Sequence, residues 1–495
     1  MKFFKYAFAS CAMMALTACD MDINDDPNAI SEASNDNIFP TAEMNLAATI
    51  GVDFNIYGGY NAEMYSQNSG SSNYLDYSRF DVTSTNSSLA YSQLYARVLQ
   101  QLEIVRQQSL NEPGTYLAAT TLRAYAFQAL VDAYGETPYT EALGVQTQPK
   151  YDDGDEVYAG IIAELEAAKA AASPQAAVCA NLLFGKTTAA AGKAEDWLPF
   201  ANSLLLKLYM RESGVVDVKD KVDALVAENN FIAEDIVFDK CWGNAVGSYS
   251  PLFTEQKVVA TDIVINYAVS ATVRAEGVND QRLAANWKEG TKGMIGTVSG
   301  TNLSSELPTA TDADFVQPAY RFDMPVYLMT KAEVCFFLAE YYARLNVNMA
   351  KAKNCYLQAL KASCETAGVK DVSADIASGA YPFEDNPMRA IGVQKWIHLT
   401  STLQGFEGWC ELRRIGYPAF SDQTADELIG TDIASYNLLP QTYEPATLYT
   451  PKGVYNKVGA KKLRQRFDYA ASSTQYNNNV PATKDPTVPV FWNNK

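Results

Sequence analysis

Apolar residues recur at every third or fourth position over several long stretches of the chain. Between residues 91 and 108 the apolar positions are Leu94, Tyr95, Val98, Leu99, Leu102 and Val105. This is the spacing of one face of an amphipathic helix. After a break at residues 112–114, residues 116–134 repeat the pattern with many alanines and end before Gly135, where a glycine is typical. The two helices, with small residues between them, predict an antiparallel hairpin of the tetratricopeptide type.

The same periodicity predicts further helices in two groups. It indicates helices over 157–172 and 196–211, a second hairpin from 330–345 and 349–363, and a long helical stretch over 386–414 that Gly405 and Gly408 interrupt. The helical repeats therefore occupy about 91–211 and about 330–414. We expect a mainly α-helical, tetratricopeptide-like scaffold.

Two long segments have no helical period. Residues 51–90 and 213–325 are rich in Gly, Ser, Thr, Asn and turn signals. Because irregular segments on a rigid frame usually carry binding residues, we expect these two insertions to form a ligand-binding surface. We interpret residues 37–495 as one domain with loop-rich insertions rather than as several domains.

The N-terminus predicts export and lipid anchoring. Two lysines precede an apolar run, and residues 1–18 have the organisation of a signal peptide. The sequence Leu16-Thr17-Ala18-Cys19 resembles the lipobox of bacterial lipoproteins, which implies that Cys19 is acylated and anchors the mature chain. An ordinary signal peptide with an unrelated cysteine is the alternative. Residues 19–36, in which Cys19 is followed by DMDINDDPN, predict a flexible acidic tether. The acidic residues after Cys19 resemble the surface-export signal of Bacteroidetes lipoproteins.

Charge and composition exclude several kinds of function. The chain has 39 basic and 57 acidic residues, a net charge of −18, which argues against a nucleic-acid partner. His398 is the single histidine and lies in an apolar helical segment, so we expect a core residue rather than a catalytic base. No Cys-x-x-Cys pair or Gly-rich phosphate loop is present. We therefore predict no cofactor, no metal site and no catalytic residue, although 57 carboxylates leave a glycosidase pair open.

Motifs distributed over the whole chain resemble the SusD/RagB family of outer-membrane nutrient-binding lipoproteins. They are AYGETPYTEA at 133–142, DWLPFANSL at 196–204, NDQRL at 279–283, MTKAEVCFFLAE at 329–340, GFEGWCELRRIGYP at 405–418 and VPVFWN at 488–493. The sequence departs from the family pattern in three places. Gln281 stands where proline is usual, RFDYA at 466–470 stands where Arg-x-Pro-Tyr-Pro is usual, and Gln475 replaces the common glutamate.

The resemblance implies a cell-surface protein that binds glycan and passes it to a SusC-like TonB-dependent transporter, over which it sits as a hinged lid. Aromatic rings suit the apolar faces of sugars, and polar side chains suit their hydroxyls. The predicted ligand-binding residues are Tyr57, Tyr60, Asn73, Tyr74, Tyr77, Arg79 and Trp287, with Trp242, Tyr249 and Tyr320 as further candidates. Core packing is the alternative for each aromatic residue. A peptide-binding RagB-like protein and, less favoured, a surface glycan hydrolase are the alternative functions.

Overall fold

The computed structural model describes residues 33–68, 74–185, 189–259, 263–300, 311–428 and 443–493. The predicted signal peptide, Cys19 and Asn73 lie outside these residues, as does most of the predicted tether. Helix α2 begins at Asn35, so the helical fold starts slightly before the predicted end of the tether at residue 36.

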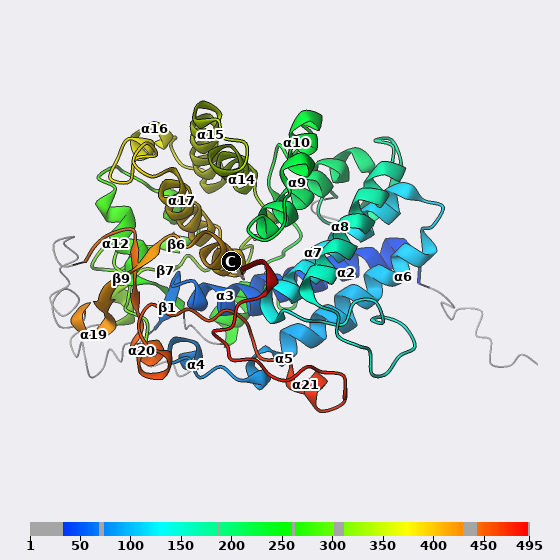
Figure 1. Cartoon of the computed structure of the whole chain (residues 1–495), viewed down its shortest axis with the longest axis horizontal. Helices are drawn as coiled ribbons and strands as arrows, with labels where there is room; N and C mark the ends of the chain where they lie inside the picture. Colours follow the sequence, from blue (N-terminus) through cyan, green and yellow to red (C-terminus); the bar gives the residue numbers. More distant parts are fainter. Residues whose placement is uncertain are drawn as a thin grey trace, which may run out of the picture.

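Helices dominate the architecture (Figure 1). The first half contains α2 (Asn35–Thr49), η1 (Ile50–Phe54), α3 (Asn55–Asn61), α4 (Leu75–Ser78), α5 (Ser84–Gln93), η2 (Leu94–Leu99), α6 (Gln100–Gln108), α7 (Pro113–Tyr134), α8 (Gly154–Ala171), α9 (Ala194–Glu212) and α10 (Lys219–Glu228). The second half contains α11 (Pro251–Phe253), η3 (Thr254–Val259), α12 (Tyr267–Ala275), η4 (Arg282–Ala285), η5 (Asp312–Asp314), α14 (Lys331–Arg344), α15 (Met349–Ala367), α16 (Ser373–Ala377), α17 (Pro387–Ser401), α18 (Gly405–Ile415), α19 (Ala425–Leu428), α20 (Lys452–Val458), α21 (Ala471–Thr474) and η7 (Phe491–Asn493).

The predicted helical scaffold is confirmed. Helices α7, α8 and α9 pack in sequence, α14 and α15 form the second hairpin, and α9 packs against α14 to join the two groups. Gly135 follows α7 with a φ of 84°, as a residue just after a helix often does. The predicted stretch over 386–414 divides into α17 and α18 next to Gly405. The fold is mainly α-helical, with a tetratricopeptide-like scaffold.

The two insertions contain more helix than the sequence predicted. Residues 35–61 form one continuous rod of α2, η1 and α3, in which η1 is a π-helical turn, so the irregular interpretation of 51–61 was wrong. Helix α3 shows no helical period because it is buried on nearly all sides: six of its seven residues are buried. The central insertion likewise contains α10 and α12.

Five two-stranded ribbons join the described segments. Four are antiparallel: β1 (Tyr65–Gln67) with β5 (Ile263–Ile265), β2 (Ala177–Asn181) with β3 (Ala190–Lys193), β4 (Ile236–Phe238) with β8 (Val326–Met329), and β6 (Trp287–Lys288) with β7 (Gln317–Pro318). The fifth, β9 (Ala419–Thr424) with β10 (Thr447–Thr450), is parallel. The β1–β5 pairing sets Tyr65 opposite Ile265 and so brings the first insertion against the central one.

One continuous hydrophobic core runs from Phe39 in α2 to Trp492 near the C-terminus. This continuity supports the interpretation of 37–495 as one domain, which we retain as a proposal. The C-terminal segment returns to the helical scaffold, where the indole of Trp492 donates to Asp132 of α7 at 2.7 Å. Among the described residues, no helix has the length and hydropathy needed to cross a membrane.

Candidate functional site

Four of the predicted ligand-binding tyrosines lie together. Tyr57 stacks on Tyr77 with ring centroids 4.8 Å apart and planes inclined by 17°, and Tyr60 stacks on Tyr74 at 5.7 Å and 30°. Tyr60 also faces Tyr77 at 6.1 Å. We call Tyr57, Tyr60, Tyr74 and Tyr77 the tyrosine cluster. Tyr57 and Tyr74 are partly exposed, whereas Tyr60 and Tyr77 are 3% and 5% exposed, so the inner pair supports the outer pair.

Two helices position the cluster: α3, which precedes strand β1 in the sequence, and α4, which follows it. Tyr57 and Tyr60 lie on α3, and Tyr77 lies on α4, which packs against α3. Helix α3 is itself held against α18 at Gly58, where a Cβ atom would lie 2.3 Å from the Cα atom of Phe406. The close approach of these two backbones therefore fixes the half of the cluster that α3 carries.

Tyr74 adopts an unusual backbone conformation next to a polar partner. Its φ is 58°, in the left-handed region that a bulky side chain rarely adopts. Its hydroxyl donates to Oε1 of Glu255 at 3.0 Å. Residues held in such conformations are concentrated at ligand sites. Glu255 lies on η3, a π-helical turn, and such turns are frequent at functional sites.

A second carboxylate adjoins the cluster. Asp53, on the π-helical turn η1, accepts a long hydrogen bond of 3.5 Å from the hydroxyl of Tyr57. Burial and, to a smaller extent, the negative charge of Glu255 raise the pKa of Asp53 to about 6. Burial and the charge of Asp53 also raise the pKa of Tyr57. Asp53 and Glu255 were not predicted as site residues, because they are 202 positions apart in the sequence.

The central insertion adds polar groups beside Glu255. Tyr320, a predicted candidate, is partly exposed, and its hydroxyl donates to Oε1 of Gln256 at 3.5 Å. Tyr249 is also partly exposed and packs edge-on against Phe253 at 5.1 Å. These residues flank the start of η3, so the two insertions meet in one region of the structure. That this region binds ligand stays a prediction.

Other predicted residues lie elsewhere. Trp287 is 2% exposed, packs against Tyr65 and donates from its indole to the backbone oxygen of Thr400 at 2.8 Å, which favours core packing, the alternative interpretation for this residue. Trp242 is 9% exposed and donates to Phe238. Arg79 is exposed at the end of α4. Asn73 lies outside the described residues.

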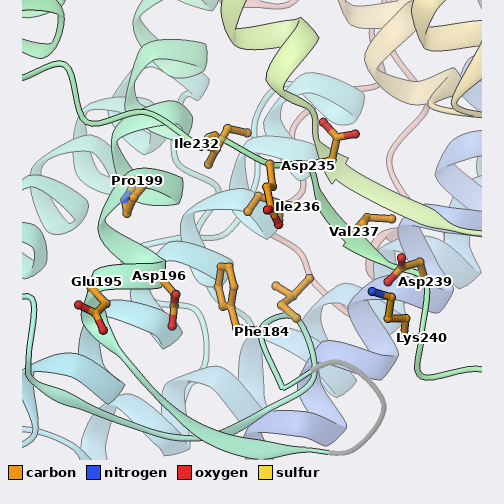
Figure 2. Close-up of a pocket in the computed structure, with 13 residues that line it drawn as sticks. Phe184, Glu195, Asp196, Pro199, Ile232, Asp235, Ile236, Val237, Asp239 and Lys240 are labelled. Carbon is orange, nitrogen blue, oxygen red and sulfur yellow. The ribbon is translucent and has the colours of Figure 1, made fainter. Parts of the chain in front are cut away.

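Away from the cluster, an acidic pocket of about 390 Å³ opens between the start of α9 and β4 (Figure 2). Its charged lining residues are Glu195, Asp196, Glu234, Asp235, Asp239 and Lys240. Asp235 already accepts from the backbone N–H of Lys331 and the hydroxyl of Thr366. Phe184 provides the aromatic wall and packs against Trp197 at 5.0 Å. The pocket has no stacked pair of rings like that of the tyrosine cluster.

His398 is a core residue, as the sequence predicted. It is fully buried between the hydroxyls of Thr330 at 2.8 Å and Ser363 at 2.9 Å. Burial lowers its pKa to about 3, and the charges of Arg282 and Lys395 act in the same direction. Among the described residues, no group of three or more His, Cys, Asp or Glu side chains has the arrangement of a metal site.

Solved structures share this fold. A chitin-binding protein superposes with a TM-score of 0.71 at 19% identity, covering 93% of this chain and 99% of the other. A SusD homologue from Bacteroides uniformis gives 0.68 at 22% identity, covering 93% and 100%. A chitin-binding SusD homologue from Flavobacterium johnsoniae gives 0.66 at 18% identity, covering 90% and 94%.

Sequence comparison identifies the family directly. No curated protein matches the chain. The family model SusD-like, described as starch-binding and associating with the outer membrane, matches residues 27–440, which is most of the sequence. The structural matches cover the same region and extend beyond it to nearly the whole chain. The chain therefore belongs to the SusD-like family of starch-binding proteins that associate with the outer membrane.

Proposed function

We propose that this protein is a non-catalytic, lipid-anchored cell-surface protein that binds an oligo- or polysaccharide at the tyrosine cluster and delivers it to a SusC-like TonB-dependent transporter. The observation that carries the proposal is the stack of Tyr57, Tyr60, Tyr74 and Tyr77, whose outer rings are partly exposed. Flat rings of this kind bind the apolar faces of sugars. Membership of the SusD-like family and two structural neighbours described as chitin-binding support the same ligand class.

Retardation of the purified protein in native gels that contain different polysaccharides tests the binding proposal. We expect at least one glycan to retard the wild type, and Tyr57→Ala or Tyr74→Ala to weaken retention about tenfold or more, since each removes a stacking face. Tyr57→Phe and Tyr74→Phe keep the ring and should retain most of the binding. Tyr476→Ala removes an exposed tyrosine (75% exposed) near α21 and serves as the matched control. Unchanged retention in both alanine variants would refute the role of the cluster.

Peptide is the alternative cargo, as in the RagB branch of the family. Stacked rings beside carboxylates also bind peptides, so the same gels should be complemented by calorimetry with a mixed peptide library. Binding of peptides with no retention by any glycan would replace the glycan proposal. Because delivery requires a partner, we expect the transporter encoded with this protein to co-purify with it from solubilised outer membranes.

A surface glycan hydrolase is the second alternative, and one observation favours it. Glycosidases use two carboxyl groups, one of which has a raised pKa, and Asp53 beside Glu255 has this character. A reducing-sugar assay on every retained glycan separates the two functions. Release of reducing ends by the wild type, lost in Asp53→Asn, would overturn the binding-only proposal.

A further inference from the structure

The two carboxylates beside the tyrosine cluster have no basic partner in the part of the chain that the structure describes. Asp53 and Glu255 are both partly exposed, and among the described residues neither lies within 4.0 Å of a lysine or arginine nitrogen. Many buried carboxylates elsewhere in the fold lie close to a basic side chain, as Glu407 does to Arg211 at 2.6 Å. The site therefore leaves two acidic groups without a compensating cation, unlike the buried ion pairs of the helical scaffold.

This arrangement opposes folding rather than supporting it. Two like charges that act on each other in a partly buried place destabilise the native state. Burial and then the charge of Glu255 raise the pKa of Asp53, which shows that the folded environment disfavours its ionised form. A perturbed acidic group such as Asp53 is a candidate for a functional role.

The geometry points to hydrogen-bond acceptance. An ionised carboxylate only accepts hydrogen bonds and has several lone pairs. Tyr57 donates to Oδ1 of Asp53 and Tyr74 donates to Oε1 of Glu255, so each carboxylate is oriented by the edge of a ring on which a sugar would stack. A sugar lying on either ring brings its hydroxyl or acetamido N–H groups to the remaining lone pairs.

The same two charges act against an anionic ligand. A carboxylate or sulfate on the sugar would face Asp53 and Glu255 at short range, where partial burial weakens solvent screening. The cations nearest in sequence, Arg79 and Lys257, are exposed. The net charge of −18 adds long-range repulsion of the same sign.

We propose that Asp53 and Glu255 are the specificity-determining residues of the site, and that they restrict it to glycans without carboxylate or sulfate groups. They accept hydrogen bonds from hydroxyl or amide donors of a stacked ring and repel acidic sugars. This inference rests on the proposed function, because it assumes that the tyrosine cluster binds glycan.

Pairs of glycans that share a backbone test the inference. Chitohexaose and 6-O-sulfated chitohexaose form one pair, and unsubstituted xylan and glucuronoxylan form the second. Calorimetry should show, in at least one pair, binding of the neutral member and affinity at least about tenfold lower for the acidic member. The double variant Asp53→Asn/Glu255→Gln should reduce this ratio several-fold, because it keeps acceptor oxygens for both tyrosine hydroxyls and removes both charges.

A matched control separates the local charges from the net charge of the protein. Asp155→Asn/Glu156→Gln removes two exposed acidic residues in the first turn of α8 and should leave the ratio unchanged. Raising the salt concentration should narrow the ratio in the wild type more than in the site variant. Equal or tighter binding of the acidic member by the wild type, or an equal effect of both double variants, would overturn the inference alone. Failure of every glycan to bind would instead count against the proposed function.

Discussion

Buried carboxyl groups outside the tyrosine cluster make single residues sensitive to pH. Glu43 of α2 is fully buried and accepts from the backbone N–H groups of Leu182 at 2.6 Å and Leu183 at 3.4 Å. Burial nevertheless raises its pKa to about 8. Burial also raises the pKa of Glu63 and of Glu276 to about 8. Each of these groups is neutral in the folded protein at pH values at which the unfolded chain has released the proton.

The sign of the resulting pH dependence follows from linkage. Between about pH 4.5 and pH 8 the folded protein holds a proton on Glu43 that the unfolded chain does not. Stability from this group is therefore fully present below pH 4.5 and is lost as the pH rises towards 8, by up to about 1.4 kcal/mol per pH unit. We predict that the free energy of unfolding falls less steeply with pH in Glu43→Gln. The stability of the variant relative to the wild type should therefore increase with each pH unit from 5.5 to 7.5.

Urea denaturation at several pH values checks this prediction. The control is Glu156→Gln, which changes an exposed glutamate of α8 and should give a curve parallel to that of the wild type. If the Glu43→Gln and wild-type curves are also parallel over this range, Glu43 is ionised in the folded protein and the prediction is wrong.

At the scale of elements, a buried ion-pair network joins the two helical groups. Its members are Asp132 on α7, Lys207 and Arg211 on α9, Glu333 and Glu340 on α14, Lys395 on α17, and Glu407, Glu411 and Arg414 on α18. Glu407 lies at its centre and accepts from Lys207 at 3.1 Å and Arg211 at 2.6 Å. Since all these groups are buried, each charge depends on its partners.

We predict that Glu407→Gln lowers the free energy of unfolding by about 3–5 kcal/mol, because it leaves Lys207 and Arg211 buried with too little negative charge. Chemical denaturation measures the loss. The control breaks an exposed pair instead: Lys221→Met, which removes the partner of Glu166 at 2.8 Å, should cost less than about 1 kcal/mol. A loss of that small size in Glu407→Gln would show that the network relaxes or admits water.

Helix periodicity explains which elements the sequence could predict. Helices α8 and α15 have one buried and one exposed face, so their apolar residues recur with the helical period. Helices α7, α9, α17 and α18 are buried on most sides, and their length and helix-forming residues support the same prediction. The bounds of these helices were predicted within a few residues. Helix α3 is buried on nearly all sides and contains two adjacent glycines, so it has neither the period nor the composition of a typical helix. Tertiary contacts, not local preference, make it helical.

The close approach of α3 and α18 gives a prediction that connects packing to binding. Gly58→Ala would place a methyl group 2.3 Å from the backbone of Phe406, and no side-chain rotation relieves that contact. We expect a loss of stability at or above the upper end of the about 1–3 kcal/mol usual for overpacking, together with weaker glycan retention, because α3 carries Tyr57 and Tyr60.

Thermal denaturation and the gels described above check both effects. In the control, Gly144→Ala, the nearest atom to the added Cβ is 4.0 Å away, so stability and retention should not change. If Gly58→Ala is as stable as the wild type and retains glycan equally well, the close packing of α3 on α18 is not needed to hold the site, and the prediction is wrong.

At the scale of the whole molecule, the site depends on segments that the sequence separates widely. Tyr57 and Tyr74 come from the first insertion, whereas Glu255 and Tyr320 come from the second. The aromatic character of the first insertion predicted the tyrosines. No local pattern predicted the carboxylates. Asp53 and Glu255 lie beside the tyrosine cluster only because folding brings η1 and η3 to it. Trp287 shows the opposite error. It was predicted as a ligand-binding residue because it is an aromatic residue in the second insertion, but it is buried in the core.

The predicted membrane anchor, Cys19, lies outside the described residues and concerns the molecule as a whole. An acidic protein with a net charge of −18 is not attracted to anionic lipid, so we expect membrane association to require acylation at Cys19. The 16 Cα–Cα steps from Cys19 to Asn35 span at most about 55 Å when fully extended, which is long enough for the proposed lid to move while it stays attached. We predict that Cys19→Ser abolishes incorporation of labelled palmitate and moves the protein from the outer-membrane fraction to the soluble fraction.

Cys241→Ser, which changes a partly buried thiol in the central insertion, should keep both the label and the membrane location. A Cys19→Ser protein that still fractionates with the outer membrane would show that protein contacts, rather than acyl chains, hold it there.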